Sequence, residues 1–147
     1  MLPNHQPSQK SHMKSLYRLV VLMVALTSVG AFGADSTGNY MVGGGAGGVR
    51  CPEFVATMER ARTHKIGSLR YVQETQGFTM YLLGFQTGYN VSTPDTYDIF
   101  PGSEGDYPLL SWIENYCRLN PTSRFGDGVV ALAQDRHAKR QRSAQSK

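Results

Sequence analysis

The chain has 147 residues, 15 Lys and Arg against 11 Asp and Glu, and two cysteines, which suits one domain and argues against a multidomain enzyme. The formal net charge of +4 is unevenly distributed. Eight basic residues lie before residue 35 or after residue 135, whereas every acidic residue lies between these limits. The central part therefore carries more acid than base, and we expect no nucleic-acid-binding surface there.

An apolar run near the N-terminus predicts export. Two basic residues precede Leu19–Leu26, and small residues follow it, which is the order of regions in a secretory signal peptide. The run is far shorter than the about 20 apolar residues that span a bilayer. We therefore expect residues 1–33 to be removed, with cleavage after Ala31 or Gly33. The mature protein is expected in the periplasm or outside the cell, without stable membrane insertion.

Cys51 and Cys117 are predicted to form a disulfide, because cysteine pairs in small exported domains are usually oxidised. This bond would close a loop of about 66 residues, which corresponds to roughly 4 kcal/mol of stability on a chain-entropy estimate. The alternative is a nucleophilic Cys117 activated by His64 or His137, and only the residue types favour it. Because the sequence has neither a Gly-x-Ser-x-Gly motif nor metal-ligand spacing, we predict no enzyme, catalytic residue, metal or cofactor.

Residues 34–50 are rich in glycine, serine and threonine. Gly43, Gly45 and Gly48 formally match the G-x-G-x-x-G pattern of dinucleotide-binding proteins. No hydrophobic strand precedes the match, so the pattern carries little weight. We predict that residues 34–50 form a flexible segment.

Apolar residues at helical spacing predict four helices in residues 51–136. The four stripes are Cys51, Phe54, Val55 and Met58; Tyr71, Phe78, Tyr81, Leu82, Phe85 and Tyr89; Leu109, Trp112, Ile113, Tyr116 and Cys117; and Phe125, Val129, Leu132 and Ala133. Pro52 suits the first turn of a helix, Asp106 is expected to cap the third helix, and Thr122 or Ser123 the fourth. The sequence has no alternating runs of strand length. The predicted fold is therefore all-α, a small four-helix domain with one disulfide.

The second predicted helix, at roughly residues 70–90, contains Gly84 and Gly88 on one face. We expect a neighbouring helix to pack closely against these glycines, with a bound ligand as the alternative. Residues 137–147 contain no apolar side chain larger than alanine and several basic ones. This basic C-terminal tail is predicted to be disordered.

The connection at residues 91–106 contains four carboxylates, which are Asp95, Asp98, Glu104 and Asp106. Their spacing lacks the alternating oxygen ligands of an EF-hand, so we expect a solvated acidic loop rather than a calcium site. A pair of them acting in glycoside cleavage has no further support. The neighbouring aromatic residues, Tyr97, Phe100 and Tyr107, make this loop a candidate surface for recognition of a partner protein.

Three short motifs occur in a characteristic order, namely Cys51-Pro52-Glu53-Phe54, Gly84-Phe85-Gln86-Thr87-Gly88-Tyr89-Asn90 and Tyr116-Cys117-Arg118-Leu119-Asn120-Pro121. With the final helix, this order resembles the HdeA/HdeB family of small periplasmic acid-stress chaperones. It is also similar to the Tai family of periplasmic immunity proteins for type VI secretion effectors. The resemblance covers about residues 51–135.

Resemblance to the HdeA/HdeB family implies binding of unfolding client proteins in acid. Below about pH 4 the carboxylates lose their charge, while the 12 Lys and Arg after residue 33 keep theirs. The domain would then open in part, within the limit set by the disulfide. The residues we expect to bind clients are Phe85, Tyr89, Trp112 and Phe125. Resemblance to immunity proteins instead implies one protein partner, and a homodimer stays open for either function.

Overall fold

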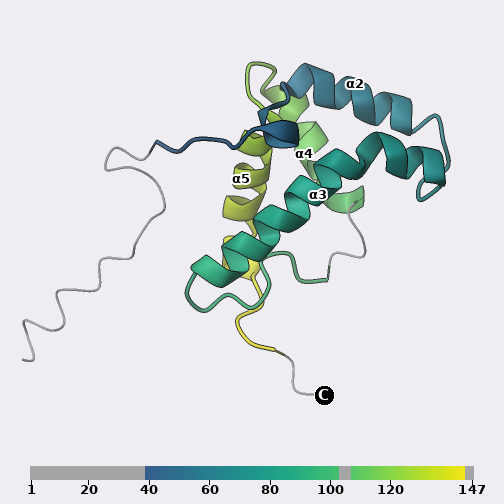
Figure 1. The fold of residues 1–147 in the computed structure, drawn as a ribbon. Helices are drawn as coiled ribbons and strands as arrows, with labels where there is room; N and C mark the ends of the chain where they lie inside the picture. The colour runs from purple at the N-terminus through teal and green to yellow at the C-terminus, as the bar shows by residue number, and fades with distance from the viewer. Residues whose placement is uncertain (1–38, 103–106, 145–147) are drawn as a thin grey trace, which may run out of the picture. The chain divides into compact units, whose positions relative to one another are not determined.

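The computed structural model describes residues 39–102 and 107–144. Its elements in chain order are η1 (Gly45–Gly48), α2 (Cys51–Ala61), α3 (Leu69–Ser92), α4 (Tyr107–Leu119), α5 (Phe125–Arg136) and η2 (His137–Lys139), where η marks a 3-10 helix (Figure 1). No strand occurs within the described residues, and the predicted all-α fold of four helices is confirmed. The predicted signal peptide lies outside the described residues.

The helix starts follow local sequence signals. Pro52 occupies the first turn of α2, and the Ser68 hydroxyl caps α3 by accepting a hydrogen bond from the Tyr71 backbone N–H. The start of α5 differs from the prediction. Neither Thr122 nor Ser123 caps it, because the N-cap position is Arg124, whose backbone N–H donates to the Asp127 carboxylate at 2.8 Å. The predicted Asp106 cap of α4 lies outside the described residues.

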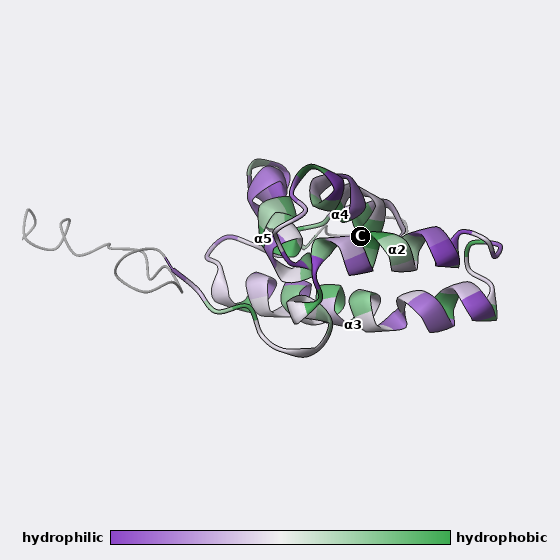
Figure 2. Cartoon of the chain, turned by 90° about the horizontal axis from the view of Figure 1, so that it is seen from above, coloured by the Kyte–Doolittle hydropathy of each residue, from purple (hydrophilic) through white to green (hydrophobic). Residues whose placement is uncertain are grey.

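Three aromatic rings from three helices form the centre of the core. Phe54 of α2, Phe78 of α3 and Phe125 of α5 have ring centroids 4.7 to 4.8 Å apart in tilted or edge-on geometry. Buried apolar residues of α4, among them Leu110 and Ile113, complete this cluster. Figure 2 shows α4 and α5 on the same side of α3. The core thus lies between α3 and these two helices, with α2 packed against both α3 and α4.

The glycine run is not a flexible linker throughout, as the sequence had suggested. Residues Gly45–Gly48 form η1, which packs against α3 and α5. Gly47 is buried, and a Cβ atom there would lie 2.3 Å from the Tyr81 ring. A Cβ atom at Gly126 would lie 2.3 Å from Val42 Cγ1 and 3.0 Å from the Gly47 carbonyl oxygen. These two glycines therefore allow η1 to approach α3 and α5 closely.

The expectation of a helix packed closely against Gly84 and Gly88 is wrong. Both residues are exposed, and a Cβ atom at either would have no heavy atom within 4 Å outside the local helix. The side of α3 that carries them faces away from the core. The core instead takes up Tyr71, Phe78 and Leu82 on the opposite side of the helix.

The predicted disorder of the C-terminal tail is wrong for its first part. Residues His137–Lys139 form η2, and the Gln141 backbone exchanges hydrogen bonds with Tyr97 and Asp98. The Arg140 guanidinium donates to the Asp95 carbonyl oxygen, to a hydroxyl of the same loop and to the His137 carbonyl oxygen. The tail thus fixes the loop that follows α3.

Candidate functional site

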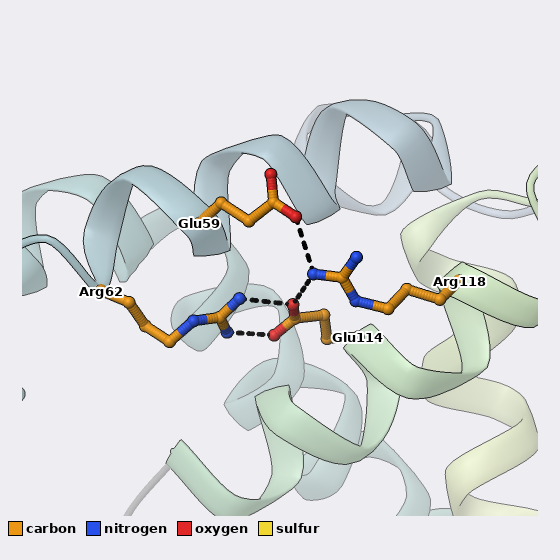
Figure 3. Close-up of polar contacts among 4 residues, drawn as sticks. All are labelled: Glu59, Arg62, Glu114 and Arg118. Carbon is orange, nitrogen blue, oxygen red and sulfur yellow. Dashed lines mark hydrogen bonds and ion pairs between the residues drawn. The ribbon is translucent and has the colours of Figure 1, made fainter.

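Two kinds of contact join α2 to α4. At the start of α2, Cys51 forms the predicted disulfide with Cys117 of α4, with their Cα atoms 4.8 Å apart. The pairing of these cysteines is therefore confirmed. At the other end of α2, charged side chains of both helices meet in what we call the α2–α4 ion cluster, made of Glu59, Arg62, Glu114 and Arg118 (Figure 3).

Glu114 is the centre of this cluster. Its side chain is only 5% exposed, although it is a carboxylate on the apolar side of α4. Arg62 donates from both terminal nitrogens to the two carboxylate oxygens, with Nη2 to Oε1 at 2.7 Å. Arg118 donates from Nη2 to Glu114 Oε1 at 2.7 Å. Because one oxygen of Glu114 accepts from two arginines and the other from one, the buried charge is fully paired.

Arg118 also connects the cluster back to α2. Its Nη2 atom lies 2.8 Å from Oε1 of Glu59, which is in the last turn of α2. This pair is about half exposed on both sides, so we expect it to contribute little by itself. Its main effect is to hold Arg118 in place beside Glu114.

The α2–α4 ion cluster shifts the pKa values of Glu114 and Arg62 in the directions that favour their charged forms. Hydrogen bonds from Arg62 lower the pKa of Glu114 below its ordinary value of 4.5, with help from Arg118, and this outweighs the opposing effect of burial. The hydrogen bond to Glu114 raises the pKa of Arg62. Glu114 therefore stays ionised until the solution is more acidic than an ordinary glutamate requires.

Sequence reasoning missed this cluster, although one signal was available. Glu114 lies four residues after Leu110 and three before Cys117, which places it on the apolar stripe of its own helix. A carboxylate at such a position needs a cationic partner, because an unpaired buried charge is very costly. The sequence does not show which arginine provides it, since Arg62 lies 52 positions earlier.

The four residues expected to bind clients do not form one surface. Phe125 is fully buried in the core against Phe54 and Phe78. Phe85 and Tyr89 are half-buried neighbours on α3, with ring centroids 5.9 Å apart.

The remaining aromatic contacts hold these rings in place. Trp112 is half-buried and stacks on Tyr116 at 6.2 Å. The Tyr89 hydroxyl lies 2.8 Å from Nδ1 of His137, so this histidine fixes an aromatic ring. In the folded state the expected client-binding rings are thus hidden or partly covered.

Hydrogen bonds hold part of the acidic loop in place, whereas the sequence had suggested a solvated loop. Asp98 Oδ1 accepts hydrogen bonds from the Gln86 side chain at 2.7 Å and from the Phe100 backbone at 3.0 Å. Tyr97 is exposed, whereas Phe100 is buried, so Phe100 is not part of a recognition surface as the sequence had suggested. Tyr107 is half-buried, and the two carboxylates at residues 104 and 106 lie outside the described residues.

Within residues 39–102 and 107–144, no group of three His, Cys, Asp or Glu side chains is placed to hold a metal ion. None of the helices in that part is long and apolar enough to cross a membrane. No protein-family model, curated protein or solved structure matches the chain.

Proposed function

We propose that this protein is an exported binding protein that protects other polypeptides as they unfold in acid, as the resemblance to the HdeA/HdeB family implies. In this proposal residues 1–33 direct export and are removed, and the mature domain acts in the periplasm or outside the cell without catalysing a reaction. The observation that carries the proposal is the buried, doubly paired Glu114 between α2 and α4.

The α2–α4 ion cluster provides a specific site for the action of acid. Above its folded-state pKa, Glu114 is charged and holds Arg62 and Arg118. The charged and titratable groups around it are Glu59 and Arg62 of α2 and Tyr107 and Arg118 of α4. When Glu114 takes up a proton, two arginines lose their buried charged partner, and the exposed Glu59–Arg118 ion pair is left between the end of α2 and α4.

The disulfide determines how far this opening goes. Cys51 at the start of α2 stays bonded to Cys117, so acid loosens the Arg62 end of α2 while the other end stays attached. Met58 and Ala61, nearer the end that loosens, are fully buried in the closed state, whereas Phe54, which covers Phe125, lies one turn after Cys51. Loosening of the Arg62 end therefore uncovers buried apolar surface for clients without complete unfolding.

Suppression of aggregation tests this proposal. We would measure light scattering of an acid-sensitive client protein from pH 7 to pH 2 with the exported form of the protein, its disulfide intact. We expect suppression only at low pH. We also expect Glu114→Gln to extend suppression to higher pH, because this change removes the charge that holds the arginines.

The matched control is Glu53→Gln, the same substitution at an exposed position in the first turn of α2. Its pH profile should follow that of the unmodified protein. A protein that stays folded and suppresses no aggregation at any pH would overturn the proposal.

A second function is favoured by one observation, the ordered loop after α3. An immunity protein presents a fixed surface to one partner, and the hydrogen bonds of Asp98, Arg140 and Gln141 hold exposed Tyr97 in a fixed loop. Under this alternative, one partner binds at neutral pH, and Tyr97→Ala weakens binding without changing the acid response.

A further inference from the structure

The turn between α2 and α3, residues 63–70, projects from the domain, and we call it the α2–α3 corner. Figures 1 and 2 both show it beyond the ends of α4 and α5. The Ser68 backbone N–H donates to the Lys65 carbonyl oxygen at 2.9 Å, and Gly67 has a φ angle of 78°, which suits glycine. This tight turn places Ile66 at its tip, where the residue is 49% exposed. The corner is thus a preformed projection.

Large aliphatic side chains face solvent at the corner. Leu69, in the first turn of α3, is 73% exposed, and Val72, three residues later, is 44% exposed. Ile66 and Val72 also line one apolar groove of about 470 Å³ between α3 and the start of α4. The exposed apolar surface therefore continues from the tip of the corner into this groove. Surface of this kind usually marks a contact with another molecule.

Positive charge surrounds these aliphatic side chains. Residues 60–73 contain four Lys and Arg and no Asp or Glu. The first two arginines of this segment pair with acidic residues of α3 and α4. Lys65 directly precedes Ile66, and Arg70 directly follows Leu69. Both of these cations are exposed, and neither forms an ion pair within the described part of the chain, so both are available to an external partner.

We propose that the α2–α3 corner docks on an anionic membrane surface. Aliphatic side chains flanked by cations match both layers of such a surface, because the apolar groups enter the boundary with the acyl chains and the cations contact acidic headgroups. An acidic protein would pair with the cations but leave Ile66 and Leu69 in water. An uncharged apolar partner would remove water from the cations without pairing them. An anionic membrane satisfies both kinds of side chain.

The expected binding is weak and reversible. A basic residue near an anionic surface raises the partition constant by about fivefold, and partial burial of a leucine or isoleucine raises it by roughly tenfold. Two residues of each kind predict half of the protein bound at on the order of 1 mM anionic lipid. Docking is peripheral and requires no helix to cross the membrane. It uses no residue of the α2–α4 ion cluster and does not rest on the proposed function.

Cosedimentation with lipid vesicles at pH 7 tests the docking. We would use the exported form with its disulfide intact and vesicles of phosphatidylcholine, with or without about 30% phosphatidylglycerol. We expect binding to the anionic vesicles only. Binding should weaken by at least about tenfold when the salt concentration rises from about 0.05 M to about 0.5 M, because salt screens the cations.

Two pairs of variants distinguish the corner from other exposed positions. Leu69→Ser should lower the partition constant roughly tenfold. Leu119→Ser should leave it unchanged, since this leucine is 82% exposed but follows Cys117, at the opposite end of α2 from the corner. Arg70→Gln should lower the constant about fivefold. The same change at exposed Arg142 in the basic tail, Arg142→Gln, should lower it by less than about twofold, because no large apolar side chain anchors the tail. Circular dichroism verifies that each variant is folded.

Tryptophan fluorescence tests insertion of the corner directly. The emission of Leu69→Trp should shift to shorter wavelength on anionic vesicles, whereas that of Leu119→Trp should not, and Trp112 contributes the same background to both. Several results would overturn the proposal: no binding to anionic vesicles, equal binding to neutral ones, or equal losses within either pair of variants. Binding to polyglutamate that is as tight as binding to vesicles and unaffected by Leu69→Ser would also overturn it and would indicate an acidic protein partner.

Discussion

The α2–α4 contact buries a charged group, whereas the outer side of α3 exposes apolar ones. Between α2 and α4, a carboxylate is buried, paired with two arginines and placed in the same helix contact as a disulfide. On α3, large apolar side chains face solvent beside exposed glycines. The first region is specified by contacts within the chain, and its properties depend on pH and redox state. The second makes few contacts within the chain, so its properties depend on what binds to it.

Removal of the disulfide should produce the largest effect. The double substitution of Cys51 and Cys117 by serine should lower the free energy of unfolding by about 4 kcal/mol, because the loop between them is 66 residues long. Denaturant unfolding monitored by circular dichroism measures this change. Met80→Ser on the outer side of α3 is the control, and it should change the free energy of unfolding by less than about 0.5 kcal/mol, because Met80 is 68% exposed. A loss under about 1 kcal/mol for the serine pair would show that the α2–α4 contact is not the more constrained region.

Truncation of an arginine in the ion cluster should have the next largest effect. Arg62→Ala leaves Glu114 buried with one arginine instead of two, and we expect a loss of about 3 kcal/mol at pH 7. Arg60→Ala is the matched control at the same end of α2. Its pair with Glu74 is exposed and 3.6 Å long, so its removal should cost less than about 0.5 kcal/mol. Thermal unfolding measures both losses of stability. Equal losses for Arg62→Ala and Arg60→Ala would contradict the claim that the buried ion pair contributes more than the exposed one.

Substitution of alanine for Gly126 and for Gly84 should change stability in opposite directions. Gly126→Ala should destabilise the fold by about 2 kcal/mol, because its Cβ atom would overlap Val42 and approach the Gly47 carbonyl oxygen. Gly84→Ala should stabilise α3 by up to about 1 kcal/mol, because the site is open and alanine favours helix. Thermal unfolding measures both changes. Destabilisation by both changes would mean that the outer side of α3 is packed within the monomer.

The sequence predicts the helices well because each has a local apolar stripe and recognisable boundaries. The disulfide also follows from local information, namely two cysteines in a chain with export features. By contrast, the packing of η1 depends on small residues at positions 47 and 126 and on the Tyr81 ring, which come together only in the folded chain. A glycine run that is flexible by composition and one that fits closely between helices look the same in the sequence.

The candidate site and the tail also depend on contacts that form only in the folded chain. Glu114 on an apolar stripe signals a buried charge, but its principal partner lies 52 positions away. The tail after residue 136 has a disordered composition, yet Arg140 and Gln141 are held by backbone groups of the loop at residues 95–98. Backbone acceptors have no sequence signature, so contacts of this kind cannot be predicted from the residue types.

The central claim is that acid opens the domain by protonating Glu114, and the pH dependence of stability tests it most directly. The folded-state pKa of Glu114 lies below its ordinary value of 4.5, so its stabilising contribution is complete above that pH and is lost as the pH falls through the folded-state value. We would measure the free energy of unfolding from pH 7 to pH 2 for the unmodified protein, Glu114→Gln and Glu53→Gln.

We predict that Glu114→Gln is less stable at pH 7 and loses less stability on acidification, so that its curve converges with that of the unmodified protein below pH 4.5. Glu53→Gln should parallel the unmodified protein throughout. If the Glu114→Gln curve instead ran parallel to that of the unmodified protein from pH 7 to pH 2, protonation of Glu114 would not be what opens the domain.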